Sequence, residues 1–320
     1  TSSLSDLIQG TGGAAISDIR ATTTGDGQSI RIGVDPRIDP DRRGSAVGGA
    51  GGRPDLRAER QRGGDGGAAS TTVEGIALGD SEVDVSAYAS GGAGGVADSS
   101  GTSGAGGTAL ARAVGRNAGA STVTVRAVAV GGSGNNEGAQ SGANGLTGGD
   151  AKATAHGESD GGGDVTVIAR VFGGGSYAGP GVDTVLRDAV SGRTSGVLRL
   201  VQEVFGAQQA RPDAAGRGSA ARSELTIDDS ESHALILESV ATGGYGRVTG
   251  SAFAQASGVG SGDVSVLARA TGGSGDLARS GDGGAATVGR VFGESRRGGL
   301  VRVVGEALGG TGARTPAIGH

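Results

Sequence analysis

The chain has 320 residues, a net charge of −5 and no cysteine, which excludes a disulfide framework and a cysteine-based zinc site. Glycine accounts for 71 residues and aromatic residues for only 2%, so the large side chains that usually fill a globular core are scarce. No basic patch interleaved with aromatic residues suggests nucleic-acid binding, and no apolar stretch reaches the roughly 18 residues of a membrane helix.

One alternating segment, which we name segment A, recurs along the chain and ends in Gly-Gly. Clear copies cover residues 82–92, 122–132, 164–174 and 263–273, and looser copies end near Gly206, Gly244 and Gly310. Ile30, Ile32 and Val34 look like a degenerate first copy. Alternation with period two predicts strands, and a strand repeated every 30 to 50 residues predicts an array.

Alternate residues of each segment A are expected to point inward, with larger side chains first and smaller ones last. The predicted inward residues are Val83, Val85, Ala87, Ala89, Val123, Val125, Ala127, Ala129, Val165, Val167, Ala169, Val171, Leu198, Leu200, Gln202, Val204, Leu235, Leu237, Ser239, Ala241, Val264, Val266, Ala268, Ala270, Val301, Val303, Gly305 and Ala307.

A second alternating segment, segment B, precedes each segment A. Its examples span residues 107–115, 150–157 and 284–293. The predicted inward residues are Ala109, Ala111, Ala113, Ala151, Ala153, Ala155, Thr287, Gly289 and Val291. About eight B–A pairs fit along the chain, joined by short turns from B to A and by longer glycine-rich loops from A to B.

Two all-β architectures fit this pattern. In a repetitive β-solenoid with two strands per repeat, A and B lie in facing sheets and each sheet consists of parallel strands from successive repeats. In a stacked hairpin array, A and B of one repeat pair antiparallel. We favour the solenoid, because the strands keep their length while the loops vary.

The organisation is one elongated domain in two parts. Residues 1–66 form an irregular N-terminal repeat whose insertion, Asp35–Arg62, contains Pro36, Pro40 and Pro54. Residues 67–320 form the regular array. Within it, the stretch VLRLVQEVF at 197–205 resembles a helix, but it keeps the alternation of segment A and is predicted as a strand. Because the chain starts at Thr1, we expect a processed or excised product.

The outward residues of segment A suggest how the repeats stack. In a parallel, in-register array Arg170 would lie beside Glu203, and Arg269 beside Glu306. The last outward position carries an apolar row of Val130, Phe172, Phe205 and Leu308, which we name the assembly stripe. Such a row either lies under a loop or packs on another chain.

Catalytic residues are not expected. His156, His233 and His320 lie far apart in the repeat, and no paired carboxylates or phosphate-binding loop stand out. We expect no cofactor. The calcium candidates are Asp276, in the segment GGSGD, and the nearby Asp282.

The alternating Val/Ala strands and the GGxGG loops resemble glycine-rich repeat regions of secreted bacterial surface proteins, such as adhesins and extracellular fibres. The resemblance implies an extracellular, non-enzymatic structural protein whose partner is itself, as a homo-oligomer or filament. The alternative is a monomeric solenoid that binds a ligand: cell-surface polysaccharide, another surface, or calcium. A polysaccharide-active β-helix enzyme ranks last.

Overall fold

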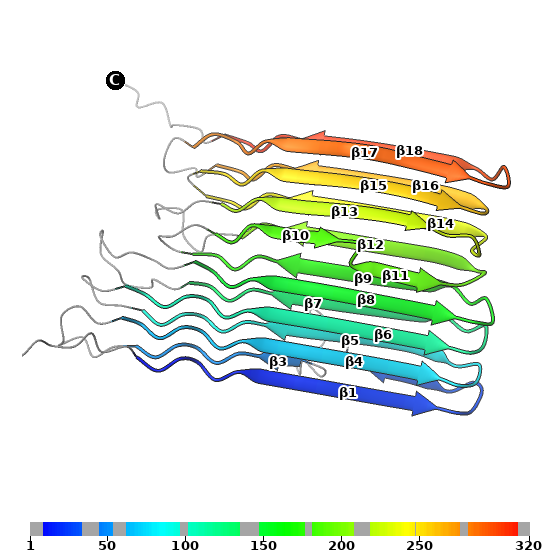
Figure 1. Cartoon of the computed structure of the whole chain (residues 1–320), viewed down its shortest axis with the longest axis horizontal. Coiled ribbons are helices and arrows are strands. Elements are labelled where there is room, and N and C mark those ends of the chain that lie inside the picture. The colour runs from blue at the N-terminus through cyan, green and yellow to red at the C-terminus, as the bar shows by residue number, and fades with distance from the viewer. Residues whose placement is uncertain are drawn as a thin grey trace, which may run out of the picture.

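The computed structural model contains only strands, turns and irregular segments in the part that it describes. The described ranges are 9–33, 45–53, 62–96, 102–134, 147–176, 181–207, 218–246, 248–275 and 281–312. The prediction of an all-β, repeat-like fold is therefore confirmed. In Figure 1 the strands form a stack that runs from β1 at the bottom to β17 and β18 at the top.

Three parallel sheets hold the strands, and A-type and B-type strands pair only with their own type. The nine-stranded sheet contains the A strands β18 (Val301–Leu308), β16 (Asp263–Thr271), β14 (Ala234–Thr242), β12 (Val197–Phe205), β9 (Val165–Phe172), β7 (Val123–Val130), β5 (Glu82–Ser90) and β2 (Ser29–Ile32), with β3 (Ser45–Val47) also on β5. One B sheet contains β1 (Ala15–Thr23), β4 (Ala69–Ala77), β6 (Ala109–Asn117), β8 (Ala151–Ser159) and β11 (Val190–Arg193). The other contains β10 (Thr184–Arg187), β13 (Ala221–Asp228), β15 (Ala252–Gly260) and β17 (Ala286–Ser295).

Every ladder among the described strands is parallel, whereas the stacked hairpin array requires antiparallel pairs of A with B. The predicted register holds: β9 pairs with β12 so that Arg170 lies opposite Glu203, and β16 pairs with β18 so that Arg269 lies opposite Glu306. The stretch at 197–205 is a strand, as expected.

The core is a thin apolar layer between the nine-stranded sheet and the two B sheets. The predicted inward residues of β5, β7, β9, β12, β14 and β16 are buried, and so are the predicted alanines of β6 and β8. Val83 and Val85 are fully buried, while Asp84 between them is half-buried on the outer face. Small side chains suffice because facing backbones come close. A Cβ on Gly75 of β4 would lie 2.7 Å from Val85.

The inward assignment is only partly right in the last B strand: Val291 packs against the core, as predicted, but Thr287 does not. The ladder of β17 on β15 shifts between Ala254 and Ala256, where a β-bulge adds a residue. Before the bulge, Thr287 pairs with Phe253 and is exposed, whereas Ala286 and Val288 pack against the core. After the bulge, Val291 packs against the core. A bulge changes the parity of every later residue, so strict alternation in the sequence cannot locate the inward face on both sides of it.

The last A strand differs from its neighbours in exposure. Val301 and Val303 occupy inward register positions but remain 40% and 42% exposed. Gly305 and Ala307 are exposed as well. No described strand follows β18 in the sheet, so one side of these residues has nothing packed against it.

Strands on both sides of residue 66 belong to the same sheets, because β1 pairs with β4 over their full length and β2 pairs with β5. Ile30 and Ile32 are buried in line with Val83 and Val85. Val34 lies outside the described residues, as do Pro36, Pro40 and Pro54 of the predicted insertion.

The glycine-rich segments beside the strands are not free loops, in contrast to the sequence-based expectation. Gly92 N–H donates to Gly67 O, Gly107 N–H to Gly92 O, and Gly132 N–H to Gly107 O, each at 2.8–2.9 Å. We name this relay, which alternates between A and B segments, the glycine column. A Cβ on Gly132 would lie 2.0 Å from Gly92 O. Only glycine fits where backbones approach so closely, as at the axis of collagen.

The glycine segments also have a three-residue hydrogen-bonding period. In the segment 91–95, Gly91 and Gly94 donate to Val130 and Ser133 of the next A segment, at 2.9 and 2.8 Å. Gly92 and Gly95 donate across to B-segment glycines. These segments therefore run side by side beyond the left ends of the strands in Figure 1 and extend the ordered stack.

The B layer breaks between β10 and β11. β10 pairs with β13 and β11 pairs with β8, and between them Asp188 adopts a positive φ of 43°. Backbone groups at such a break lose their ladder partners and, when buried, need others.

The fully buried side chain of Gln202, on β12, supplies those partners. Its amide nitrogen donates to Leu186 O at 3.0 Å, to Ser223 Oγ at 3.0 Å and to Glu224 O at 3.1 Å. Its oxygen accepts from Ala189 N–H at 2.9 Å. This one side chain replaces ladder bonds on both sides of the break, which explains a glutamine in an otherwise apolar column.

Substitution of Gly132 tests the glycine column. We expect Gly132→Ala to lower the free energy of unfolding by at least about 2 kcal/mol, because the added methyl group meets a carbonyl oxygen that cannot move without breaking the relay. Urea unfolding followed by circular dichroism measures the change. Gly309→Ala is the matched control, since a Cβ there has no atom within 4 Å. Equal stability of the two variants would contradict the close-approach argument.

Substitution of Gln202 tests the repair of the break. Gln202→Leu keeps the volume but leaves Ala189 N–H and the Leu186 carbonyl without their partner, so we expect a loss of about 2–4 kcal/mol. Gln255→Leu, at a half-buried outward position of β15, should change stability by less than about 0.5 kcal/mol. An unchanged urea midpoint for Gln202→Leu would show that the network contributes nothing to stability.

Candidate functional surfaces

The assembly stripe is only partly continuous. Val130, Phe172 and Phe205 are direct cross-strand neighbours on β7, β9 and β12. The rings of Phe172 and Phe205 stack at 4.7 Å between centroids and 9° between planes. Leu308 stands apart, because Thr242 of β14 and Thr271 of β16 separate it from Phe205 in the same row. The three contiguous residues are half-buried, and Leu308 is 48% exposed.

Charged pairs cover much of the remaining outer face of the nine-stranded sheet. The two predicted pairs form: Arg170 Nε bonds Glu203, and Arg269 Nε lies 2.7 Å from Glu306 Oε2. Two diagonal pairs were not predicted, Arg126 with Asp84 and Arg199 with Glu238, both at 2.7 Å. A search for opposite charges displaced by two residues between adjacent copies would have found them. Exposed pairs of this kind add little stability, but they favour one register over others.

The outer face of the B layer carries a polar row across β8 and β11. His156 Nδ1 lies 2.8 Å from Ser191 Oγ, and His156 Nε2 lies 2.9 Å from Glu158 Oε1. Burial of Glu158 opposes its ionisation, yet the hydrogen bond from His156 and the nearby Arg116 and Arg193 outweigh it and lower the pKa of Glu158. These side chains project from the adjacent strands β8 and β11 and form a cross-strand network.

The calcium candidates are not brought together within the described structure. Asp276 lies outside the described residues. Asp282 is exposed, and its backbone carbonyl accepts a bond from Thr249 Oγ1 at 2.9 Å. Among the residues that the structure describes, no group of three or more His, Asp or Glu side chains has the spacing of a metal site.

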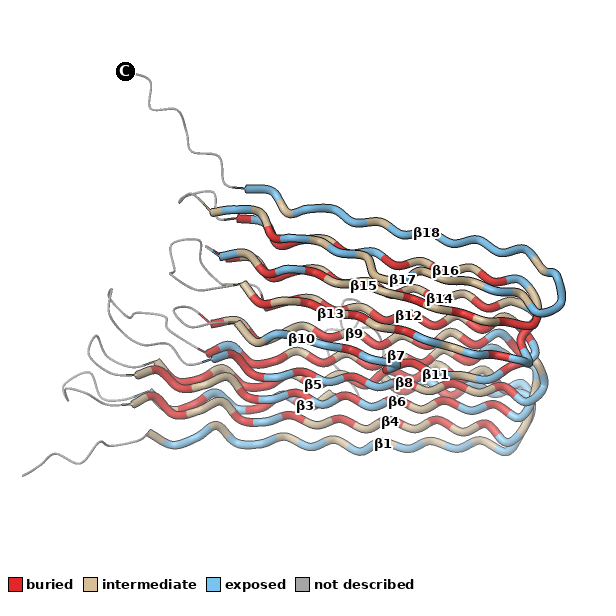
Figure 2. The backbone as a smooth tube through the Cα atoms, turned by 45° about the horizontal axis from the view of Figure 1, so that its top comes forward, coloured by how far each residue is buried: buried red, intermediate tan, exposed pale blue. Residues whose placement is uncertain are grey.

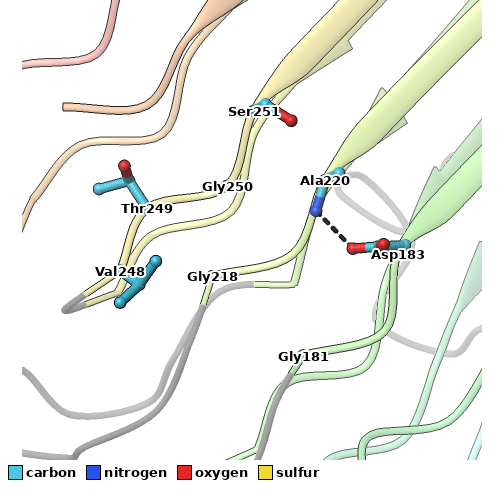
Figure 3. A pocket seen from close by; sticks show the side chains of 8 residues that line it. All are labelled: Gly181, Asp183, Gly218, Ala220, Val248, Thr249, Gly250 and Ser251. Atoms are coloured by element: carbon cyan, nitrogen blue, oxygen red, sulfur yellow. Dashed lines mark hydrogen bonds between the residues drawn. The ribbon is translucent and has the colours of Figure 1, made fainter.

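A shallow groove of about 400 Å³ crosses three neighbouring segments just before β10, β13 and β15 (Figure 3). Glycine backbone forms much of its floor, and Asp183, Val248, Thr249 and Ser251 supply the side chains. Asp183 Oδ1 accepts the N–H of Ala220 at 2.8 Å, which fixes the carboxylate at the groove wall. The sequence did not indicate this groove, because it arises where segments about 30 residues apart become neighbours.

Comparison with protein-family models, with curated proteins and with solved structures found no match to this chain. Within the described ranges, no helix is long and apolar enough to cross a membrane. A hypothesis about the function of the chain therefore has to be based on its own structure.

The phenylalanine pair can be tested by a double-mutant cycle. We expect Phe172→Ala and Phe205→Ala each to destabilise the chain, with a coupling energy of about 0.5–1.5 kcal/mol, because offset or stacked rings contribute beyond their buried area. Urea unfolding of the two single variants and the double variant gives the coupling. Thr271→Ala, two strands beyond Phe205 in the same row, provides a control at a position that is not a cross-strand neighbour of either ring. Additive effects of the two phenylalanine substitutions would mean that the rings do not interact.

Proposed function

We propose that this chain is an extracellular structural protein, a β-solenoid with two strands per repeat that forms a segment or subunit of a surface fibre, matrix filament or adhesin. The observation that carries the proposal is the unbroken parallel register from β2 and β3 to β18, with the glycine column beside it. Among the described residues, strand contacts are spread over all repeats, and no group of three or more His, Asp or Glu side chains has the spacing of a metal site. Such distribution suits a rod or a fibre better than an enzyme.

The assembly stripe supports lateral self-association as one element of this proposal. Val130, Phe172 and Phe205 form an apolar row beside the charged pairs of the same face. Such a row can pack against a second apolar row, and the charged pairs at its margin can fix the orientation. Leu308 lies outside this continuous row. The lateral surface is therefore proposed for the three contiguous residues.

The groove before β10, β13 and β15 favours the alternative function, a monomeric solenoid that binds polysaccharide. Asp183, Thr249, Ser251 and glycine backbone groups offer hydrogen bonds suited to sugar hydroxyls. Under this alternative the repeats present a surface and self-association is not needed. Calcium would then act through Asp282 and its neighbours.

Sedimentation separates the two functions. We expect the pure chain, at micromolar concentration and neutral pH, to sediment as a concentration-dependent series of assemblies, and negative-stain micrographs to show rods. Phe172→Ala combined with Phe205→Ala should reduce the width of bundled rods without dissolving them. A single monomeric species under these conditions, unchanged by millimolar calcium, would contradict the fibre and leave the monomeric adhesin.

A further inference from the structure

The two ends of the described stack are open sheet edges. In Figure 2, β18 at one end and β1 at the other are coloured almost wholly exposed or intermediate, whereas the strands between them contain many buried residues. Within the described strands, β18 pairs only with β16, β1 only with β4, and β2 and β3 only with β5. Edges of this kind carry unpaired N–H and C=O groups and are templates for a further strand.

We infer that the end face of β17 and β18 binds the end face of β1, β2 and β3 of a second copy, head to tail. This inference rests on the proposed structural function and names its axial interface. The interface is heterologous, so it does not close on itself and each added copy presents a new end.

The apolar residues of the two faces match in register. Val301 occupies the same register position as Ile30, and Val303 the same position as Ile32. Leu308 likewise corresponds to Val47, and both are about half exposed, at 48% and 47%. Stacking one repeat further would therefore place Val301 and Val303 against Ile30 and Ile32, which are already buried within their own chain, and would cover the exposed flanks of the two valines. It would also place the exposed Leu308 against the exposed Val47.

Two glycines provide independent support. Gly309 corresponds to Gly272, where a Cβ would lie 2.0 Å from Gly284 O, and to Gly91, where it would lie 1.9 Å from Gly107 O. Gly13 corresponds to Gly67 and Gly107, which are equally confined. Yet a Cβ on Gly13 or Gly309 meets no atom of its own chain within 4 Å, and neither has a positive φ. Nothing within the described chain requires glycine at these two ends, whereas a further repeat would.

Head-to-tail stacking would continue the glycine column. The relay ends with Gly310 N–H on Gly284 O, and it begins with Gly49 N–H on Gly13 O, both at 2.8–2.9 Å. Alternation of A and B segments makes Gly13 the next member after Gly310. Gly13 N–H of the second copy would therefore donate to Gly310 O, and Gly13 O would come against Gly309.

One position opposes the contact. Arg302 of β18 would lie opposite Arg31 of the second copy, and like charges directly opposite each other destabilise a sheet. Glu82 lies 3.6 Å from Arg31 and compensates in part. Replacing Arg302 by glutamate should therefore strengthen the association and make it less sensitive to low salt, since the new pair attracts.

The chain has no cysteine, so cross-linking can read the register directly. In the double variant Val47→Cys, Leu308→Cys the two thiols should meet only between copies, and oxidation at micromolar concentration should give a ladder of covalent oligomers on a denaturing gel. The matched control Val47→Cys, Arg302→Cys places the second thiol six residues away, roughly 20 Å along the strand, and should give no ladder.

A second experiment tests the same interface with the variant Gly309→Ala. We expect it to leave the urea midpoint of the unassociated chain unchanged and to lower the sedimenting fraction at least ten-fold, because the methyl group meets Gly13 O of the second copy. Leu110→Ala, an exposed position of β6 far from both ends, should leave sedimentation unchanged.

The outcomes separate this inference from the proposed function. Assemblies that sediment normally in Gly309→Ala, and give no ladder with the Val47 and Leu308 cysteines, would overturn the axial interface and leave lateral assembly. A wild-type chain that stays monomeric and gives no ladder would overturn both. A ladder from the off-register control as well would show unspecific contact and would also overturn the inference.

Discussion

Close contact between glycine backbones is the constraint on which the rest of the structure depends. In the glycine column each N–H donates to a carbonyl of the facing segment. A Cβ added to one of these glycines would lie about 2 Å from a carbonyl oxygen. Such packing tolerates no shift of one residue, because a shift would bring a larger residue into the same space. Most A strands end beside this column and most B strands start beside it, so the column fixes the register of the adjoining sheets.

A fixed register explains why a core made largely of valine and alanine is sufficient. Equivalent positions stack from repeat to repeat, so Val123 lies between Val83 and Val165, and Val125 between Val85 and Val167. Across the layer, Gly115 faces these valines. The layer is thin, and small side chains are enough to fill it. The same stacking turns isolated charges and aromatic residues into rows, which is how Arg170 finds Glu203 and Phe172 stacks on Phe205.

Two interruptions of the array are compensated by nearby residues. At the break between β10 and β11 the buried amide of Gln202 bonds the backbone groups that lost their ladder partners. At β17 a bulge absorbs one extra residue, after which the ladder on β15 resumes. The described part of β18 contains no bulge or buried side-chain network of this kind. Its inward valines remain exposed on one side, and its ladder with β16 is regular. A regular open edge with matching apolar positions favours the addition of another repeat over a capped end.

The sequence by itself determined the strands of segment A, their inward residues from Val83 to Ala270 and the neighbours Arg170–Glu203 and Arg269–Glu306. Alternation with period two and recurrence of one pattern are local signals, and in-register stacking adds only one assumption to them. Composition also predicted the small-residue core. Tertiary structure alone decided the glycine column, the break at Asp188 with its repair by Gln202, and the bulge in β17 that leaves Thr287 facing outward. These features depend on hydrogen bonds and close contacts between residues about 30 positions apart in the sequence. The repeating pattern describes what the copies share, so it does not indicate which copy contains a break or a bulge.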